Sequence, residues 1–386
     1  MAKTVQNVKD SIRGMLTGLN LNNVTNLNGT LERTARELAQ WVDIPDVIGR
    51  SSLTLYDGVT DYTAPTGIFG SAIVDLRRQG ASRNASDFAY QQNIETFDRT
   101  KDWVTTGWQA TFEYVNGVQR LRVATAIPDP RLELDPMTDD VGWTAAGSAG
   151  SLAEDDVVYW DAPASLRFTL TGSSTGTLTK TIGTVDLTDY KDSGVAFLAI
   201  RTPAISTLTN IVLRVGSDAS NYYSVTETDG FLGAWVVNEW LLTAFDLSGK
   251  STTGTPDDDA TDYVQLRIAH TATITNFYVG GLWIARPSPH YIYHQTASFF
   301  QASGSSPSAS ITSDSDSVVL DDSALLLYEH LAALNIALGQ GGTRATPLVE
   351  ELQMKLFGRG IKPGLVDIYR GDNPSQQLRV VGSYLD

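Results

Sequence analysis

The middle of the sequence, residues 152–288, breaks into short runs in which apolar and polar residues alternate. The clearest runs cover residues 166–170, 196–200, 211–215, 222–226, 263–269 and 277–284, and Gly, Ser, Asp and Thr fill the intervals. A period of two places successive side chains on opposite faces of a strand, and many such strands at short intervals are typical of two packed β-sheets. The sequence therefore predicts an all-β jelly-roll sandwich. We bound it at residues 146–288, because the small-residue stretch 145–151 precedes it.

Both ends of the chain show helical spacing instead. Apolar residues recur every three or four positions over 5–15 and again over 31–42. Near the C-terminus, Asp321 and Asp322 precede an apolar stripe that ends at Gly339, and Pro347 opens another stripe. No stripe is broad enough to be stable alone, so we expect the terminal helices to share one bundle.

A small β-region is predicted between the first helices and the sandwich. Strand-like runs cover 53–76, and residues 109–114 and 120–124 flank Asn116-Gly117, which favours a tight hairpin. The fold class is therefore α+β multidomain: a helical bundle from both termini, a small β-region and an inserted all-β jelly-roll sandwich. The expected domains are N-terminal helices with the hairpin region (1–145), the sandwich (146–288), a return strand, loop and helices (289–357), and an extended arm (358–386).

Charge and composition exclude several classes of function. The net charge is −16, and residues 146–288 carry 8 basic and 16 acidic side chains. A protein that binds nucleic acid specifically needs a basic block, and none is present; an acidic surface suits a channel through which DNA slides. The chain has no cysteine, which removes disulfides and thiolate metal sites. We read no signal peptide and no membrane-spanning run, so no membrane partner is expected.

The residues that could support chemistry have ordinary structural explanations. His290 and His294 have the spacing of a helical zinc pair, but their segment alternates like a strand, which would place the rings about 13 Å apart. The acidic runs 155–156 and 257–259 are expected in solvent-facing turns, with structural calcium and paired carboxylates for glycoside hydrolysis as the alternatives. We therefore predict no catalytic residue, no metal and no cofactor, and a protein that is not an enzyme.

Aromatic residues are the more informative feature of the predicted sandwich. Tyr222, Tyr223, Trp235 and Trp240 lie close together in the sequence. Such rings either fill the sandwich core or form a platform for a glycan or another subunit. The sequence leaves both interpretations open.

The C-terminal arm is rich in apolar residues, although its glycines and prolines oppose a long helix. Extended apolar segments gain hydrogen bonds by adding to another sheet or by lying in a groove. We expect the arm to dock on another protein or a neighbouring subunit through five residues: Leu378, Val380, Val381, Tyr384 and Leu385.

Three features together resemble one family. The first is the segment 53–65, whose sequence is LTLYDGVTDYTAP. The second is the Asn116-Gly117 hairpin, and the third is the acidic helix start at Asp321. The chain resembles the podophage head-to-tail adaptor, or neck, proteins. That resemblance implies a structural virion protein in the neck of the particle, assembled in the host cytoplasm. It also implies a homo-oligomeric ring of twelve copies beneath the portal protein, in contact with further neck or tail proteins, which lines or supports the DNA channel without binding DNA specifically.

The predicted insert departs from a minimal adaptor. Residues 213–218 and Asn221-Tyr222-Tyr223 resemble jelly-roll decoration or carbohydrate-binding modules found on virions. The alternative hypothesis is therefore a decoration or tail-fibre-associated protein that binds a surface glycan through this insert.

Overall fold

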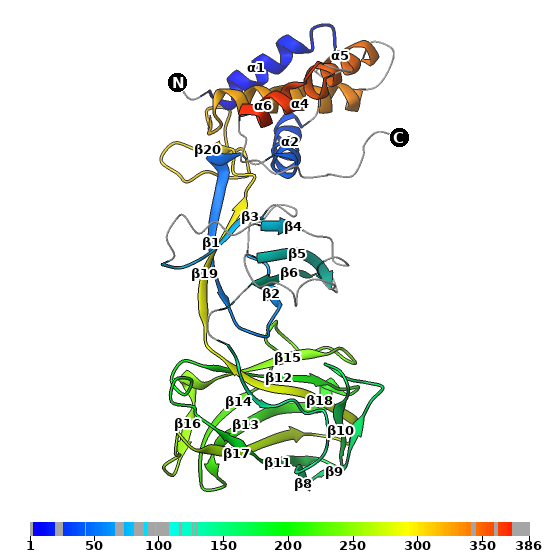
Figure 1. Cartoon of the computed structure of the whole chain (residues 1–386). Helices are drawn as coiled ribbons and strands as arrows, with labels where there is room; N and C mark the ends of the chain where they lie inside the picture. Colours follow the sequence, from blue (N-terminus) through cyan, green and yellow to red (C-terminus); the bar gives the residue numbers. More distant parts are fainter. Residues whose placement is uncertain are drawn as a thin grey trace. The chain divides into compact units, whose positions relative to one another are not determined.

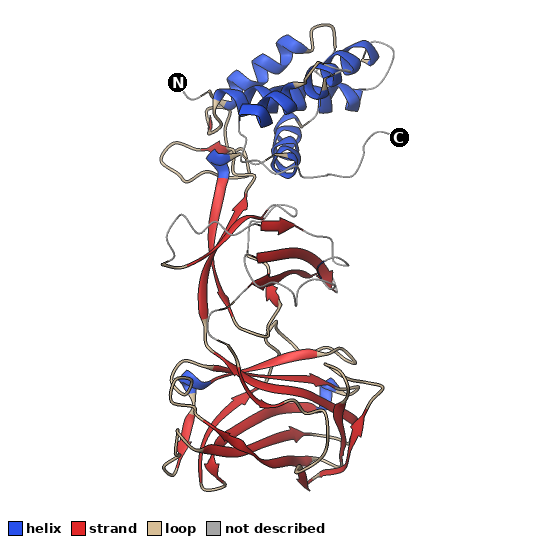
Figure 2. Cartoon of the chain, in the orientation of Figure 1, coloured by secondary structure: helices blue, strands red, loops and turns tan. Residues whose placement is uncertain are grey.

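The computed structural model describes residues 3–19, 26–42, 44–65, 73–80, 89–91, 97, 108–115, 118–125, 127, 130–340, 345–358 and 362–372. The chain divides into two compact units (Figure 1). The helical unit comprises Met1–Leu53, Ala64–Thr125 and His290–Asp386. The sandwich unit comprises Thr54–Thr63 and Ala126–Pro289. Strands dominate the chain, and the helices come from its two ends (Figure 2).

Helices from both ends of the chain build one apolar core in the helical unit. They are α1 (Val5–Met15), α2 (Leu27–Trp41), α4 (Asp322–Gln340), α5 (Thr346–Phe357) and α6 (Leu365–Asp372). Helix α4 is central and contacts each of the others. The buried cluster joins Val8 and Ile12 of α1, Leu31 of α2, and Leu352 and Leu356 of α5 to apolar residues of α4. Helices α1 and α2 thus pack against α4, which comes from the other end of the chain, and α5 and α6 pack against α4 and each other. This packing supplies the stability that a short helix lacks alone.

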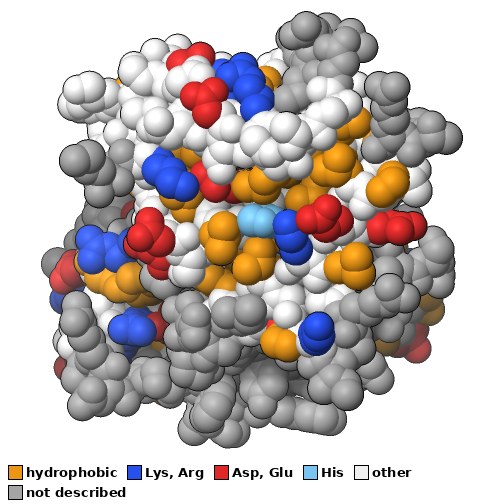
Figure 3. Space-filling view, turned by 90° about the horizontal axis from the view of Figure 1, so that it is seen from above, with side chains coloured by type: hydrophobic (Ala, Val, Ile, Leu, Met, Phe, Trp, Pro, Cys, Tyr) orange, Lys and Arg blue, Asp and Glu red, His pale blue; other side chains and the backbone are white. Residues whose placement is uncertain are grey.

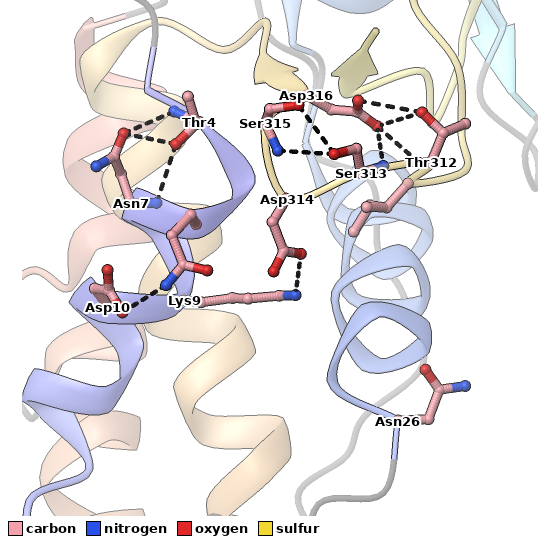
Figure 4. A network of polar contacts seen from close by, with 12 residues as sticks. Thr4, Asn7, Lys9, Asp10, Asn26, Thr312, Ser313, Asp314, Ser315 and Asp316 are labelled. Carbon is pink, nitrogen blue, oxygen red and sulfur yellow. Dashed lines mark hydrogen bonds and ion pairs between the residues drawn. The ribbon is translucent and has the colours of Figure 1, made fainter.

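A loop from the C-terminal half holds the first turn of α1 (Figure 4). The first backbone N–H groups of a helix have no partner inside it. Here Val5 donates to the carbonyl oxygen of Asp316 and Gln6 to that of Asp314, both over 2.9 Å. Thr4 completes the start of the helix, because its hydroxyl accepts a hydrogen bond from the Asn7 backbone N–H. The start of α1 is therefore fixed to the loop around residues 312–316.

The small β-region of the helical unit contains a sheet in the order β1 (Ile48–Leu55), β19 (Ser288–Gln295) and β3 (Ile73–Arg78). Strand β5 (Trp108–Val115) pairs antiparallel with β6 (Val118–Thr125) and parallel with β4 (Ala89–Gln91). The predicted hairpin is confirmed, since Val115 is paired with Val118, although Asn116-Gly117 itself lies outside the described residues. Two short strands, β20 (Phe300–Gln301) and β21 (Ser317–Val318), pair near the helices.

The sandwich unit consists of two large antiparallel sheets (Figure 1). The first, called the β18 sheet, has the order β15 (Leu241–Asp246), β12 (Val195–Arg201), β18 (Ile274–Ala285), β10 (Ser165–Leu170) and β9 (Ala149–Asp155), and β7 (Leu132–Asp135) also pairs with β18. The second, called the β17 sheet, has the order β16 (Ser251–Thr253), β14 (Asn221–Glu227), β13 (Leu208–Asp218), β17 (Thr261–His270), β11 (Ser174–Val185) and β8 (Thr144–Gly147). The short strand β2 (Asp61–Thr63) belongs to the same unit.

Alternation places one face of each sheet in the sandwich core. Phe277 and Val279 of β18, Leu198 of β12, and Leu213 and Leu266 of the β17 sheet are fully or almost fully buried in one apolar cluster. The intervening residues face outward from the two sheets. The predicted all-β sandwich is therefore confirmed.

Two expected boundaries need correction. The sandwich unit begins at residue 126 and also takes in 54–63, so the boundary at 146 falls inside it. The small-residue stretch 145–151 is not a linker, because it forms most of β8 and the start of β9, which pair with β11 and β10. The expected extended arm from 358 contains a helix, α6, because Val366 and Tyr369 are buried in the helical core. The five predicted docking residues, at positions 378–385, lie outside the described residues.

Candidate ligand-binding face of the sandwich

The outer face of the β18 sheet carries a group of aromatic side chains that remain accessible. Tyr278 of β18 lies between the buried Phe277 and Val279 and therefore points outward. The ring centroid of Trp240 is 6.4 Å from that of Tyr278 and 6.1 Å from that of Trp160, both in edge-to-face geometry. We call these three residues the open aromatic cluster. Trp160 is 36% exposed, and its neighbour Tyr159 is 44% exposed.

Glycines of β18 make room for this cluster. A Cβ atom at Gly280 would lie 2.9 Å from the Cβ of Trp160 and 2.9 Å from the Oγ of Ser165. Gly281 has a φ of +67°, a conformation that favours glycine, and its backbone N–H donates to the carbonyl oxygen of Pro136 over 3.0 Å. The bare backbone of β18 thus lets Trp160 and Trp240 lie over the sheet.

The loop that carries Trp160 is held by hydrogen bonds. The Asp155 carboxylate accepts from the backbone N–H groups of Val157 and Val158, over 3.0 and 2.8 Å. The Trp160 backbone N–H donates to the Oγ of Ser165 over 3.0 Å. The accessible indole of Trp160 is therefore presented by an ordered turn rather than by a free loop.

Two arginines flank Tyr278 on the same face. Arg167 of β10 and Arg201 of β12 are each the direct cross-strand partner of Tyr278, so the three side chains share one face. The Cζ of Arg201 lies 6.0 Å from the centre of the Tyr278 ring. Arg167 forms an ion pair with Asp155, over 3.2 Å, and its side chain is 41% exposed. Exposed rings beside guanidinium groups can stack on a flat ligand and donate hydrogen bonds to its oxygens.

The other part of this face is covered by the protein itself. Phe197 stacks on Trp283 with a centroid distance of 5.7 Å, and Tyr56 meets Phe197 edge-on at 5.2 Å. The Trp283 indole N–H donates to the backbone oxygen of Asp57 over 3.1 Å. Segment 54–63 closes these rings off from a ligand, so the open aromatic cluster is the accessible part of the face.

The outer face of the β17 sheet is less suited to stacking. Tyr222 and Tyr263 lie there but are only 9% and 8% exposed. The Arg214 guanidinium covers the Tyr222 ring, with its Cζ 4.5 Å from the ring centre, and donates to the Gln265 Oε1 over 3.0 Å. The Tyr222 ring and the Arg214 guanidinium thus contact each other and Gln265. The Tyr222 ring is therefore not open to stacking by a ligand.

The four aromatic residues singled out from the sequence do not form one site. Tyr222 faces outward from the β17 sheet, whereas Tyr223 and Trp235 belong to the sandwich core. Trp235 donates to the Oγ1 of Thr243 over 3.0 Å, which satisfies its indole nitrogen. Trp240 alone joins the accessible rings. For Tyr223 and Trp235 the core interpretation is correct.

Four residues of this face, Trp160, Arg167, Arg201 and Tyr278, were not predicted from the sequence. Tyr278 could have been found from the alternation of its strand, because its neighbours on both sides are apolar. Arg201 ends an apolar run, which is a weaker signal. Trp160 is positioned by a turn whose geometry depends on Asp155 and Ser165, so no periodic pattern marks it.

The acidic residues of the run 257–259 form hydrogen bonds and an ion pair within the sandwich unit. Asp258 accepts a hydrogen bond from the Tyr223 hydroxyl over 2.6 Å and forms an ion pair with Lys191. Burial, with this hydrogen bond second, raises the pKa of Tyr223 to about 12. Asp259 accepts from the Thr188 hydroxyl over 2.8 Å. Within the described residues, no group of three or more His, Asp or Glu side chains is arranged to hold a metal ion.

His290 and His294 lie on a strand, as the alternation of their segment predicts. Both are buried in the helical unit, at 5% and 3% exposure. The Nε2 of His294 lies 3.1 Å from the Ser51 Oγ, and burial lowers the pKa of this imidazole.

None of the helices in the described part of the chain is long and apolar enough to cross a membrane.

Comparisons with known proteins concern the sandwich. No protein-family model matches the chain, and no curated protein matches it. Among solved structures, the chain is similar to a family 11 carbohydrate-binding module from Clostridium thermocellum, in complex with a β-1,3-1,4-mixed-linked tetrasaccharide (12% identity, 40% of this chain and 94% of that one, TM-score 0.30). It is also similar to a family 30 carbohydrate-binding module of a C. thermocellum cellulosomal cellulase (12% identity, 41% and 97%, TM-score 0.30) and to a C. thermocellum family 22 module (17% identity, 40% and 91%, TM-score 0.27).

No fold, ligand or role is carried over from these similarities. They do not point to the adaptor family, so that resemblance stays a prediction.

Proposed function

We propose that this protein is a non-catalytic, glycan-binding structural protein, and that its sandwich unit binds carbohydrate through the open aromatic cluster. The observation that carries this proposal is the geometry of Trp160, Trp240 and Tyr278 on the outer face of the β18 sheet. Apolar rings of this size are normally buried, and exposed ones mark binding surfaces. A sugar ring offers flat C–H faces that stack on indole and hydroxyl groups that arginine can bind.

Exposed residues also lie close to Trp160 and Trp240 in the sequence. Val157 is 81% exposed, Tyr159 is 44% exposed and Val237 is 50% exposed, and each lies within three residues of Trp160 or Trp240 in the sequence. A surface that combines exposed aromatic and aliphatic groups with arginine suits an oligosaccharide better than a single small polar metabolite, because a small metabolite is normally enclosed in a pocket.

The test is a glycan-binding experiment with the full-length protein. An array of bacterial surface oligosaccharides, neutral and acidic, would be probed with the wild type, Trp160→Ala, Trp240→Ala and the double variant. Calorimetry with the strongest hits would follow. We expect each single variant to weaken binding about tenfold, since loss of one stacked ring removes on the order of 1 kcal/mol.

Val141→Ala is the matched control, because Val141 is an exposed apolar residue of the same unit, at 72% exposure. It should bind like the wild type. If the double variant binds every oligosaccharide as the wild type does, or if the wild type binds none, the proposal is wrong.

A second function, assembly into a ring, is supported by the surface of the helical unit. Hydrophobic side chains gather on the face of the helical unit that Figure 3 shows. Leu326 and Leu338 of α4 are 42% and 54% exposed, although α4 already buries eleven of its residues in the helical core. Exposed leucines on an otherwise buried helix favour packing against another protein surface.

We propose for this function a cyclic homo-oligomer in the neck of a phage particle, twelve copies by the resemblance above, that contacts the portal protein. The sandwich unit would then display its glycan-binding face from the ring. Light scattering after size-exclusion chromatography tests the assembly. Leu326→Glu with Leu338→Glu should reduce the oligomer to monomer, whereas Val141→Glu should not. A wild-type protein that stays monomeric at high concentration, and that does not associate with a portal ring, would contradict it.

A further inference from the structure

Some cationic side chains of the sandwich form ion pairs with carboxylates, and others do not. Residues 146–288 hold eight basic and sixteen acidic side chains. Five of the basic ones form ion pairs: Arg167, Lys180, Lys191, Lys250 and Arg286. Within the described residues, Arg201, Arg214 and Arg267 have no carboxylate oxygen within 4.0 Å of a guanidinium nitrogen.

Arg201 differs from Arg214 in its surroundings. Arg214 donates to Gln265 and lies on Tyr222, so its guanidinium has protein partners. Arg201 ends β12 on the outer face of the β18 sheet, beside Tyr278 and on the same face as Arg167. In a domain with a twofold excess of acidic residues, a cation without a carboxylate partner beside open aromatic rings is a site where an anion can be bound.

Arg167 reinforces this arrangement from the other side of Tyr278. Strands in a sheet are spaced by about 4.8 Å, so two residues on either side of one strand lie about 10 Å apart at their Cα atoms. The ion pair with Asp155 involves one nitrogen of Arg167, Nη1, and the side chain remains 41% exposed. Arg167 can thus keep its contact with Asp155 and still donate to a ligand with its remaining N–H groups.

We infer that the glycan bound by the open aromatic cluster is anionic: its sugar rings stack on Trp160 and Trp240, and Arg201, with Arg167, binds an acidic substituent. This inference rests on the proposed glycan-binding function and adds the class of ligand. The shared chemistry is an oxyanion on a sugar, either a carboxylate, as in a uronic acid, or a sulfate.

The experiment uses ligands that differ only in charge. Oligogalacturonate is titrated into the full-length protein beside the same oligosaccharide with its carboxylates methyl-esterified, and a sulfated galactan beside its desulfated form. Each pair offers the same rings with and without the anion. The wild type should bind one acidic ligand at least tenfold more tightly than its neutral form, and the preference should decrease as the salt concentration rises.

Three variants separate the two proposals. Arg201→Gln should remove most of the acidic preference, because the charged form should lose far more affinity than the neutral form. Arg267→Gln, on the β17 sheet and also without an ion-pair partner, should keep the preference. Trp240→Ala should weaken both forms alike.

The outcomes are distinguishable. Equal binding of the charged and neutral forms, lost in Trp240→Ala, would overturn the anionic class and leave the glycan-binding function intact. An acidic preference that survives in Arg201→Gln would overturn the role of Arg201. Binding that is indifferent to Trp160→Ala and Trp240→Ala would overturn both proposals.

Discussion

The hydroxyl of Tyr328 donates a hydrogen bond to the backbone oxygen of Leu31 over 2.9 Å, and both residues are fully buried. The bond joins α4 to α2, two helices that come from opposite ends of the chain. Burial raises the pKa of Tyr328 well above its usual range, so its hydroxyl stays a donor.

Tyr328→Phe should therefore destabilise the helical unit. The variant removes a buried hydrogen bond and leaves the ring packing in place, which costs about 1 kcal/mol. Thermal unfolding followed by circular dichroism should show a lower melting temperature for the helical signal. Tyr159→Phe, at an exposed position, is the control and should melt like the wild type. An unchanged melting temperature in Tyr328→Phe would show that the bond contributes nothing.

Two glycines of β11 should respond differently to alanine. A Cβ at Gly176 would overlap the Leu170 side chain and lie 3.0 Å from the Cβ of Ala149, whereas a Cβ at Gly183 would meet no atom within 4 Å. Overpacking a filled core costs about 1–3 kcal/mol. We expect urea unfolding of the sandwich to shift to lower concentration in Gly176→Ala and to stay unchanged or rise in Gly183→Ala. Equal effects would mean that the two strand positions are not distinguished by packing.

The buried imidazole of His294 should make the helical unit sensitive to acid. Burial lowers its pKa, so between that value and its unfolded pKa of about 6.5 the unfolded chain binds more protons than the folded one. The contribution of His294 to the free energy of unfolding is therefore fully present above the unfolded pKa. It is lost as the pH falls below that value. Urea unfolding at pH 7.5 and 5.5 should show a smaller loss in His294→Gln than in the wild type. An equal loss in His294→Gln and the wild type would show that this imidazole does not contribute to the acid sensitivity.

The limits of the sandwich can be tested with two fragments. Residues 146–288 lack β7 and half of β8, which leaves part of the edge of β11 uncovered, and uncovered edges promote aggregation. We expect this fragment to be insoluble and the fragment 126–289 to fold. The longer fragment should melt at a lower temperature than the sandwich in the full chain, because it lacks the contacts of Tyr56 and Tyr62 with Phe231. A soluble, cooperatively melting 146–288 fragment would contradict this view of the boundary.

The sequence predicted the sandwich strands where apolar residues alternate densely. Strands β10, β12, β13, β14, β17 and β18 fall on the predicted runs. Strand β11 was missed, since Leu178 and Ile182 are its only buried large apolar residues and threonine and glycine fill most of the rest. Its place in the sheet is determined by pairing with β17 over eight successive residues, a long-range relationship that no local pattern records.

The candidate site was predictable only in part. Trp240 was identified from composition, but the sequence could not separate it from Trp235, five residues away, which fills the core. The distinction depends on the course of the chain between β14 and β15, where Trp235 reaches Thr243. Trp160 and Arg201 meet Trp240 and Tyr278 only through the sheet order, so their association appears once the strands are paired.

Both ends of the chain belong to the helical unit, and the chain enters the sandwich unit twice and returns each time. Tension applied between the two termini would therefore be carried by the helical unit, and the sandwich would feel none until that unit opened. A pull on a ligand held by the sandwich would instead be shared among all the chain crossings between the units, each carrying a fraction of the force. Such multiple tethering distributes a load that a single linker would carry alone.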